Sequence, residues 1–487
     1  MTRANLRATI LAGGIGQRFW PLSRELNPKQ LLSMFGTESL ITAAVNRILP
    51  FAEGSGSVSI VTNERLFDEL RNHLNSQSDP RLHEVRYIQE PLPKNTAPAI
   101  ALAAATFAAE DPDAIMVVLP SDHLLEDGQV WADCIDAAAN LAAEGYLATI
   151  GIKPTRAETG YGYICAGDAL SSFAVGTATP HVAVQFVEKP SETRVQELLE
   201  RGCYFWNAGI FVMSARRVLE ELDAAGGPIA HIADVARWIV ARPVAQRNDD
   251  EARARFATIE PISIDKAVME RSERVAVIPA PLNWSDVGSL LALGSIATAD
   301  GAGNVRSGRG VDIDSHDSIV YSTDRLVATL GISDLIVVDT SDATLVLPKD
   351  RAQDVRQVVA ALKLIGAPEI TQPKVFLRPW GSYTSLLQDE GYHIRLLEIR
   401  PGGRQGLQLH EHRSEHWVVV AGTVLVTREA EEIEVGVNES AFIPPGAVHR
   451  IENRGAVVAQ VLEVGLGESS GEDDIVRFED GYHRQAE

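Results

Sequence analysis

Short apolar runs alternate with amphipathic stretches over residues 1–295. Runs of this kind, bounded by turn residues, are typical of buried parallel strands, and here they are Ala8–Ala12, Val58–Thr62, Ile115–Leu119 and Leu147–Ile150. Between the runs, apolar positions recur at helical spacing in Thr42–Leu49, Ala99–Ala109 and Trp131–Ala143. The alternation predicts an α/β domain over residues 1–295 with a mostly parallel sheet.

The character of the sequence changes after residue 295. Glycine and aspartate interrupt the helical periodicity at Asp300–Asn304 and Ser307–Gly310, and such clusters are typical of turns. Short β-forming runs follow, and then a helical pattern; they are Ser318–Tyr321, Leu326–Thr329, Leu335–Thr340, Thr344–Leu347 and the helix Arg351–Ile365. We therefore predict a small, solenoid-like β segment that ends in a helix and spans residues 296–365.

Residues 366–487 have a third pattern. Gly366–Glu369 has the composition of a linker, and short strands separated by turn residues follow it, such as Trp417–Ala421 and Val424–Thr427. This pattern predicts a separate domain folded as a β-sandwich or jelly-roll barrel. Three domains also agree with the length of 487 residues, which is too great for one hydrophobic core.

The composition excludes several classes of function. The formal net charge of −22 argues against nucleic-acid binding, which requires a basic surface. The most apolar helical run, Ala97–Ala109, is shorter than the roughly 20 residues that span a bilayer, and Ala8–Ala12 is too short for a signal-peptide core. We therefore expect a cytoplasmic protein without a membrane or nucleic-acid partner.

Three cysteines are present: Cys134, Cys165 and Cys203. They show no short paired spacing, so neither a disulfide framework nor a thiolate metal site is expected. This also fits a reducing compartment.

The most specific motif follows the first predicted strand. Gly13, Gly14 and Gly16 lie in a loop, where absent side chains let backbone N–H groups approach phosphate oxygens. A P-loop would require the sequence Gly-Lys-Ser/Thr, which is absent here. A dinucleotide-binding loop would require a third glycine where this chain has a bulky phenylalanine. The glycines alone would also suit an ordinary turn, but Arg18 and Lys29 add positive charge where a triphosphate would lie.

The loop and the motifs after it resemble those of sugar-1-phosphate nucleotidylyltransferases. Trp20–Arg24 with Pro28–Gln30 is similar to mannose-1-phosphate guanylyltransferases in particular. Further matching motifs follow in order: Asn95–Ala99, Leu119–His123, Glu158–Tyr163, Val187–Pro190, Trp206–Gly209, Ser263–Asp265 and Trp284–Gly288. The resemblance implies a Rossmann-like domain that transfers GMP from GTP to mannose 1-phosphate and releases pyrophosphate.

A sugar 1-phosphate is largely dianionic at neutral pH, so its attack needs no general base. The reaction depends instead on positioning two anions and on stabilising charge on the leaving pyrophosphate. We expect Arg18 and Lys29 to bind the polyphosphate, with Asp122 and Asp286 holding Mg²⁺ near the α-phosphorus. Asp122 follows an apolar strand, at the end where α/β sheets place their sites, whereas Asp286 is assigned by the resemblance alone.

The resemblance also assigns the remaining substrate contacts. Lys94 and Asn95 join the three glycines as nucleotide-binding residues, and the sugar contacts are Gly162, Glu188, Lys189 and Asn207. The sequence departs from the family pattern at Lys94, a usual arginine, and at Asn283 and Leu290, a usual glycine and tryptophan. These departures leave open a nucleotidylyltransferase for another sugar 1-phosphate or another nucleoside triphosphate.

A group of potential metal ligands marks the last domain. Gln408 and His410 are two residues apart, so in an extended strand they share one face. Glu415 and His449 could close the site from neighbouring strands. Nitrogen and oxygen ligands of this kind suit Zn²⁺ or another first-row divalent ion.

The spacing of these residues matches the two motifs of the cupin superfamily, which run over residues 402–422 and 444–453. Arg378–Gly381 and Arg413–Trp417 resemble the C-terminal domain of type II phosphomannose isomerase/guanylyltransferases. The resemblance implies isomerisation of fructose 6-phosphate to mannose 6-phosphate over a metal-polarised carbonyl, with Arg413 at a position tied to that activity. Gly406, Glu411 and Asn438 depart from the pattern but remove no proposed ligand.

Two alternatives remain open. Because a shared fold does not guarantee a shared activity, the cupin domain could be an inactive dimerising or regulatory module; a homodimer is expected in either case. The second alternative is a sensor that binds sugar nucleotides without turnover. The presence of the complete set Arg18, Lys29, Asp122 and Asp286 argues against this alternative.

Overall fold

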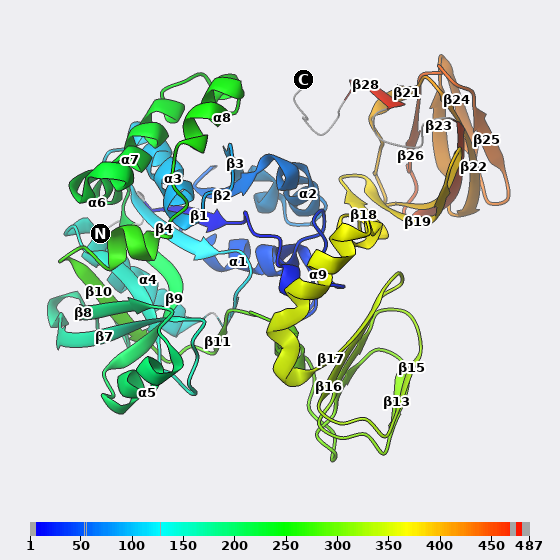
Figure 1. Cartoon of the computed structure of the whole chain (residues 1–487). Helices are drawn as coiled ribbons and strands as arrows, with labels where there is room; N and C mark the ends of the chain where they lie inside the picture. Colours follow the sequence, from blue (N-terminus) through cyan, green and yellow to red (C-terminus); the bar gives the residue numbers. More distant parts are fainter. Residues whose placement is uncertain (1–5, 53, 55, 127, 468–473, 480–487) are drawn as a thin grey trace. The chain divides into compact units, whose positions relative to one another are not determined.

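The computed structural model describes residues 6–52, 54, 56–126, 128–467 and 474–479 (Figure 1). The chain divides into two compact units. One contains Met1–Asp68 and Arg81–Ile370, and the other contains Glu69–Pro80 and Thr371–Glu487. Within the described ranges, no helix is both long and apolar enough to cross a membrane.

The first unit is built around a nine-stranded sheet (Figure 1). In spatial order its strands are β3 (Arg86–Glu90), β2 (Val58–Asn63), β1 (Leu6–Leu11), β4 (Ile115–Pro120), β9 (Tyr204–Ser214), β6 (Leu147–Ile152), β10 (Val275–Ala280), β8 (His181–Glu188) and β7 (Gly162–Ala169). Strands β3, β2, β1 and β4 are parallel, as are β6 and β10. The α/β class is confirmed, but the sheet is mixed, because β9 runs antiparallel between β4 and β6 and β8 runs antiparallel to β10 and β7.

The helices of this unit are α1 (Leu40–Ile48), α2 (Glu64–Asn75), α3 (Thr96–Glu110), α4 (Gln129–Ala143), α5 (Glu192–Glu200), α6 (Ala215–Ala225), α7 (Gly227–Val240) and α8 (Asp250–Ala257), with α2 continuing into the second unit. Helix α3 is apolar on every side and is buried from Ala97 to Phe107. A helix of that composition belongs in a core, and α3 packs against α6 and α7. The side chain of Asn95 caps its first turn, which fixes the loop at the carboxyl edge of the sheet.

A small parallel β-helix follows the sheet. Strands β12 (Val305–Ser307), β14 (Ile319–Ser322) and β16 (Leu335–Asp339) pair in parallel, and β17 (Thr344–Pro348) closes that sheet antiparallel. Strands β13 (Gly310–Ile313) and β15 (Val327–Leu330) form the second sheet. The solenoid-like prediction is confirmed, and the predicted helix begins as a 3₁₀ turn, η9 (Lys349–Asp354), before α9 (Val355–Leu364).

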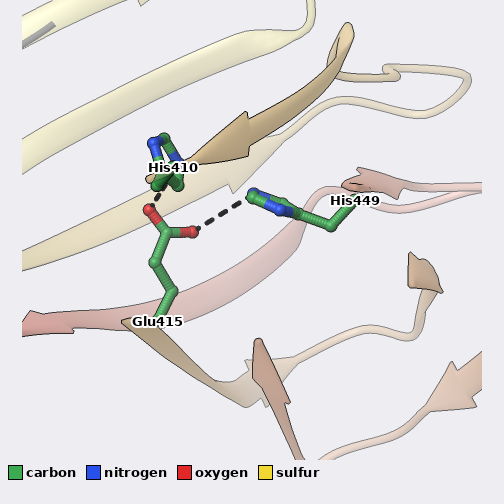
Figure 2. A group of neighbouring side chains, drawn as sticks. All are labelled: His410, Glu415 and His449. Carbon is green, nitrogen blue, oxygen red and sulfur yellow. Dashed lines mark ion pairs between the residues drawn. The ribbon is translucent and has the colours of Figure 1, made fainter. Parts of the chain in front are cut away.

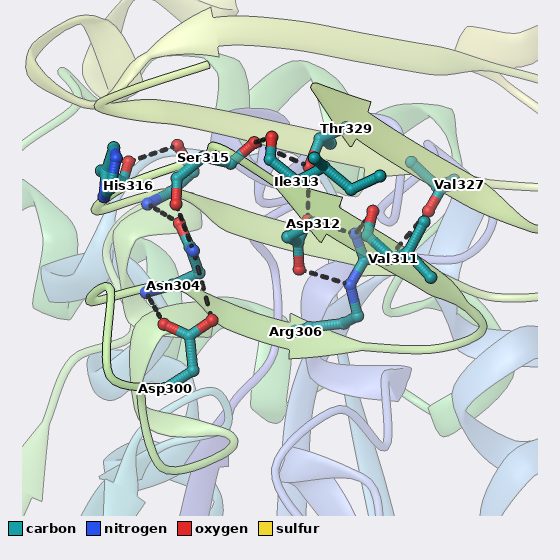
Figure 3. Close-up of polar contacts among 11 residues, drawn as sticks. Asp300, Asn304, Arg306, Val311, Asp312, Ile313, Ser315, His316, Val327 and Thr329 are labelled. Carbon is teal, nitrogen blue, oxygen red and sulfur yellow. Dashed lines mark hydrogen bonds and ion pairs between the residues drawn. The ribbon is translucent and has the colours of Figure 1, made fainter. Parts of the chain in front are cut away.

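Polar side chains connect successive coils of the β-helix (Figure 3). Arg306 pairs with Asp312 and donates a second hydrogen bond to the Val327 carbonyl at 3.1 Å. The Thr329 hydroxyl donates to Asp312 at 2.5 Å, and further along, Asn304 donates to the Ser315 carbonyl at 2.8 Å (Figure 3). Backbone groups that the short strands leave unpaired thus gain partners from side chains.

The β-helix and α9 pack onto the glycine-rich loop of the sheet domain. Phe19, Trp20 and Leu22 share one apolar core with Val355 and Val359 of α9. An ion pair adds to this contact, because the buried Arg24 lies 2.8 Å from Asp342 in the β16–β17 turn. The β-helix and α9 therefore hold the segment that follows the loop glycines.

The second unit contains two β-sheets. One consists, in spatial order, of β18 (Val375–Arg378), β19 (Gly381–Asp389), β20 (Tyr392–Ile399), β27 (Ala459–Gly467), β22 (Arg413–Ala421) and β25 (Ser440–Ile443). The other consists of β24 (Glu431–Val435), β23 (Val424–Arg428), β26 (His449–Glu452), β21 (Leu407–His410) and β28 (Ile475–Glu479). Their inner faces enclose a core that includes Trp417, Val426 and Ile451, as the predicted jelly-roll requires.

One expectation about the cysteines is wrong in this structure. Cys165 and Cys203 form a disulfide with a sulfur–sulfur distance of 2.35 Å. They are 38 residues apart in sequence, and only the antiparallel pairing of β7 with β9, which places Cys165 opposite Tyr204, brings them together. Cys134 is free and buried, and burial raises the pKa of its thiol to about 12.

Candidate active site

Two cavities open at the carboxyl edge of the first sheet. The first, here called the polyphosphate cavity, has a volume of about 770 Å³ and is lined by Gly13, Gly16, Arg18 and Lys29 among others. The second, the sugar cavity, has a volume of about 530 Å³ and is lined by Gly162, Glu188, Lys189 and Asn207 among others. Five residues line both cavities: Gly13, Pro93, Asp122, His123 and Asp286. Both predicted magnesium ligands therefore lie at the junction.

The three loop positions carry glycine for different physical reasons. Gly16 has φ +70°, and a Cβ there would lie 2.5 Å from the Cβ of Lys29. A Cβ at Gly13 would lie 2.7 Å from Oε1 of Glu90, whereas a Cβ at Gly14 would meet open space. Backbone conformation and packing thus require Gly16, whereas a side chain at Gly13 would displace only the Glu90 carboxylate. Gly14 instead leaves exposed backbone that a ligand can approach.

Lys29 connects the groups at the junction. Its buried Nζ lies 2.7 Å from Oδ2 of Asp122 and donates to the carbonyls of Asp286 at 2.9 Å and Val287 at 2.7 Å. An ammonium group has three N–H donors, so all three are used. Lys29 therefore fixes Asp122 relative to the segment that carries Asp286.

The charges around Asp122 hold it ionised. Burial alone would raise the pKa of its carboxyl, but the charge of Lys29 and the hydrogen bond that Lys29 donates lower this pKa overall. Burial lowers the pKa of the neighbouring His123, so that imidazole is neutral at pH 7. Its Nδ1 accepts a hydrogen bond from the indole of Trp284 at 3.2 Å.

Asp286 is oriented by an aromatic cluster. The Tyr161 hydroxyl donates to Oδ1 of Asp286 at 2.6 Å, and the Tyr161 ring packs edge-on against Trp206 and Trp284, each with centroids 5.2 Å away. Burial and the Asp286 charge raise the pKa of Tyr161, so the hydroxyl stays protonated and donates. The second oxygen of Asp286 lies beside Gly288, where a Cβ would be 2.7 Å away.

The residues expected to bind the sugar converge on one point. Gly162 pairs with Glu188 across β7 and β8, and a Cβ on Gly162 would lie 2.7 Å from Oε2 of Glu188 and 3.3 Å from Cβ of Asn207. Asn207 donates to Asp265 at 2.9 Å. Burial, and then the charge of Glu188, raises the pKa of Asp265 to about 6. Lys189 lies 2.6 Å from Glu188 and reaches the same cavity.

The two predicted nucleotide contacts after the loop lie in different places. Asn95 lines the sugar cavity while capping α3. The Lys94 ammonium donates to the Ala257 carbonyl at 2.9 Å, and Lys94 is absent from the lining of both cavities. Among the described residues, Lys94 is thus the one predicted substrate contact of this domain that the geometry does not bring to the site.

The buried carboxyl of Glu90 should make the stability of the folded protein depend on pH. Burial raises the pKa of its carboxyl to about 7, and its Oε2 has no hydrogen-bond partner among the described residues. The folded state thus binds this proton more tightly than the unfolded chain, and this contribution to stability is lost as pH rises from about 4.5 to about 7. Glu90→Gln should flatten that decline and raise the free energy of unfolding at pH 8 by up to about 3 kcal/mol.

Urea unfolding at pH 5 and pH 8, without nucleotide or Mg²⁺, measures this difference. The exposed Glu84 provides the matched control, because Glu84→Gln removes the same charge without burial. Parallel pH profiles for the wild type and Glu90→Gln would contradict the assignment.

The second unit holds a buried group of candidate metal ligands (Figure 2). Oε1 of Glu415 lies 3.0 Å from Nε2 of His410, and its Oε2 lies 3.6 Å from Nε2 of His449. The three side chains come from β22, β21 and β26, and each is at most 2% exposed. Gln408 is the register partner of His449, so these two side chains share one face of the sheet.

The donor atoms of this group fit a divalent cation. Nδ1 of His449 lies 2.9 Å from the Ala447 carbonyl, which makes Nδ1 the protonated nitrogen and leaves Nε2 with a lone pair. His449 Nε2 and Glu415 Oε2 are buried without a hydrogen-bond partner in the described structure. Burial alone would raise the pKa of Glu415, but His410, His449 and Arg413 lower it to about 2. An ionised carboxylate and an imidazole nitrogen with a free lone pair are ligands that Zn²⁺ and similar ions prefer.

Arg413 lies directly against this group. Its Nε is 3.2 Å from Oε1 of Glu415, and its Nη2 is 2.9 Å from Nδ1 of His410. The side chain is 2% exposed. The structure therefore brings together Arg413, His410, Glu415 and His449, with Gln408 two residues before His410 on β21.

Sequence reasoning missed several residues of the first site. Tyr161, His123, Trp284 and Asp265 were included in matching motifs without a role, and Glu90 lies in none of those motifs. For the first four, the motif position was the available signal, since aromatic and acidic residues recur there beside the predicted ligands. The contact of Tyr161 with Asp286 is between residues 125 positions apart, so only the fold could reveal it.

Three family models match the chain in succession. Residues 7–302 match the nucleotidyl transferase family, residues 308–362 the MannoseP isomerase/GMP-like beta-helix domain, and residues 367–480 the mannose-6-phosphate isomerase C-terminal family. The first model alone covers more than half of the chain. The order of the matches is the order of the sheet domain, β-helix and barrel.

Whole-length relatives decide the family. The mannose-1-phosphate guanylyltransferase of Escherichia coli is 38% identical over 486 residues, which cover 98% of this chain and 100% of that protein. The chain belongs to the mannose-1-phosphate guanylyltransferase family. The alginate biosynthesis protein AlgA of Pseudomonas aeruginosa, another relative, is 38% identical over 98% of this chain and 97% of its own length.

A solved structure agrees with the family. It is a Thermus thermophilus protein described as a mannose-1-phosphate geranyltransferase, which superposes with a TM-score of 0.63 at 32% identity. The match covers 74% of this chain and 99% of that chain. Membership of the guanylyltransferase family with a C-terminal isomerase domain, implied by the sequence motifs, is confirmed.

Proposed function

We propose that the chain transfers GMP from GTP to mannose 1-phosphate, forming GDP-mannose and pyrophosphate. The observation that carries this proposal is the junction of the two cavities at Asp122 and Asp286. A triphosphate in the polyphosphate cavity and a sugar phosphate in the sugar cavity would meet there. The family relatives named for this activity supply the identities of the base and sugar.

The chain's own residues supply positioning and charge. The phosphate of mannose 1-phosphate attacks the α-phosphorus of GTP, and the bond from that phosphorus to the β-phosphate oxygen breaks as pyrophosphate leaves. Arg18 and Lys29 line the cavity that would hold the leaving group, where fixed positive charge stabilises the developing anion. Glu188, Asn207 and Gly162 would orient the sugar so that its phosphate points to the junction.

The donor set at the junction suits Mg²⁺. Asp122 and Asp286 each direct one carboxylate oxygen to a protein partner, Lys29 and Tyr161, and each has a second oxygen available. Mg²⁺ in such sites takes one or two carboxylates, waters and substrate phosphates, and when bound it would neutralise phosphate charge. Asp122 and Asp286 would hold it.

For the barrel we propose isomerisation of fructose 6-phosphate to mannose 6-phosphate. The buried group of His410, Glu415 and His449 would hold a divalent ion, with Gln408 as a fourth ligand. Such an ion polarises a carbonyl and so eases proton transfer between C1 and C2. Arg413 is placed to orient Glu415 and His410. A barrel serving only as a dimerising or regulatory module would retain the fold without this turnover.

A substrate panel tests the proposed specificity. Pyrophosphate release is measured for GTP, ATP, UTP and CTP, each with mannose 1-phosphate and with glucose 1-phosphate, in Mg²⁺ buffer. We expect strong preference for GTP with mannose 1-phosphate. Equal or greater activity with another pair would support the reaction type but contradict the proposed substrates. The departures from the family pattern at Lys94, Asn283 or Leu290 would then be assigned to the altered specificity.

Asp286→Asn should change the Mg²⁺ dependence of the transferase. The amide keeps the shape of the side chain but removes the charge, so we expect turnover to fall by about 100-fold or more and the Mg²⁺ concentration for half-maximal rate to rise. A Mg²⁺ titration of initial rates measures both. Tyr161→Phe, which removes only the hydrogen bond to Asp286, should give a smaller loss, and an unchanged titration for Asp286→Asn would contradict the metal assignment.

A further inference from the structure

The polyphosphate cavity has a wall that does not belong to the sheet domain. Arg356, in the first turn of α9, lines this cavity together with the loop residues Gly16 and Arg18. It is exposed, and neither the sequence motifs nor the family models assign it a role. Because α9 follows the β-helix, this arginine is separated from the loop by more than 300 residues of sequence.

The pairing of the basic residues distinguishes Arg356 from its neighbours. Lys29 pairs with Asp122, Arg65 with Glu25 and Arg253 with Glu64. Of the basic side chains around the cavity, which are Arg18, Lys29, Arg65, Arg253 and Arg356, only Arg18 and Arg356 lack an ion pair within the described part of the chain. These two guanidinium groups are therefore the ones with charge available to a ligand.

The charge balance makes Arg356 significant. Five basic side chains and four acidic ones, Glu25, Glu64, Asp122 and Asp286, line the polyphosphate cavity. Without Arg356 the cavity wall would carry no net charge, although the leaving group it would receive is a polyanion. Stabilising such an anion requires fixed cations aimed at it.

The position of Arg356 is fixed by packing. Val355 and Val359, one turn apart on α9, are buried in the same core as Phe19, and α9 packs against η2 (Gln17–Phe19), the turn that carries Arg18. The backbone of Arg356 is therefore held relative to the glycine-rich loop, and only its side chain is free to adjust. A guanidinium can bind two phosphate oxygens at once through its paired N–H groups.

We infer that Arg356 binds the terminal phosphates of the nucleoside triphosphate and stays with them as pyrophosphate leaves. This inference rests on the proposed function of the two cavities. It gives the β-helix segment a part in catalysis, because α9 carries a phosphate-binding side chain to the edge of the transferase site. The sugar cavity has no such contact, since Arg356 does not line it.

The reverse reaction allows the contact of Arg356 with pyrophosphate to be tested separately from the contacts with the sugar nucleotide. In that direction GDP-mannose and pyrophosphate are two separate substrates, and only pyrophosphate would occupy the Arg356 subsite. For Arg356→Gln we expect the KM for pyrophosphate to rise about 10-fold or more, the loss typical of one charge-assisted hydrogen bond. The KM for GDP-mannose should stay within about twofold of wild type. Arg356→Lys, which keeps the charge, should recover most of the affinity for pyrophosphate.

Arg351→Gln is the matched control. Arg351 is an exposed arginine five residues earlier, paired with Asp354 and absent from the cavity lining, so its loss should leave both KM values unchanged. An unchanged KM for pyrophosphate in Arg356→Gln, with an active wild type, would overturn the inference alone. An equal rise in both KM values, or the same effect in Arg351→Gln, would also overturn it. An inactive wild type in both directions would instead overturn the proposed function.

Discussion

Lys29→Ala should reduce the kcat/KM of pyrophosphate release by at least about 100- to 1000-fold. Removing one fixed positive charge beside a developing anion typically has an effect of this size, and Lys29 has a second role as well. Its Nζ contacts Asp122 and the carbonyls of Asp286 and Val287, so its loss would leave both carboxylates misplaced. Steady-state rates with GTP and mannose 1-phosphate measure the effect.

The controls for Lys29 separate catalysis from folding. Lys153→Ala removes an exposed lysine outside both cavities and should leave the rate unchanged. Breaking a buried ion pair can also destabilise a protein by about 3–5 kcal/mol, so Lys29→Met, which keeps the apolar volume, is compared by thermal unfolding. A folded Lys29→Met variant with nearly normal turnover would contradict the role of this lysine.

His410→Ala should remove the metal and the isomerase activity of the barrel without affecting nucleotide transfer. His410 contributes a nitrogen to the buried group with Glu415 and His449. Disturbing even the groups that support metal ligands typically reduces affinity or activity by about 10- to 100-fold, so loss of a ligand should exceed this range. Metal content by mass spectrometry and the rate of fructose 6-phosphate isomerisation are measured on the same preparation as the transferase rate.

His416→Ala is the matched control for His410. His416 lies on the same strand, β22, as Glu415, but its side chain is exposed. Its removal should change neither metal content nor isomerisation. Joint loss of isomerase and transferase activities in His410→Ala would point to a structural role for the histidine. Full retention of metal and isomerisation would contradict the proposed site.

Local sequence patterns predicted the elements near both sites, but they could not predict which distant segments pair. The run Ile115–Leu119 predicted β4 and placed Asp122 at the carboxyl edge of the sheet, because a buried parallel strand has a continuous apolar sequence. Strand β9 was not predicted: its burial alternates over the first half of its length. Its insertion between β4 and β6 makes the sheet mixed, and its pairing with β7 joins Cys165 to Cys203.

The candidate sites show the same division. Motif spacing predicted that Gln408 and His410 share a strand face, and the structure places His449 opposite Gln408. No local signal connects Tyr161 with Asp286, or Arg356 with Gly16, because these contacts depend on how distant segments pack. Lys94 shows the opposite case: its motif predicted a substrate contact, but its ammonium is bound to the Ala257 carbonyl.

The central claim is that one site joins GMP from GTP to the phosphate of mannose 1-phosphate. Phosphorus NMR of the purified chain with GTP, mannose 1-phosphate and Mg²⁺ tests it most directly, since it identifies every phosphorus-containing product. The account predicts the two diphosphate resonances of GDP-mannose and the single resonance of pyrophosphate, growing in equal amounts. Unchanged substrates, or GDP with inorganic phosphate in place of GDP-mannose, would contradict it.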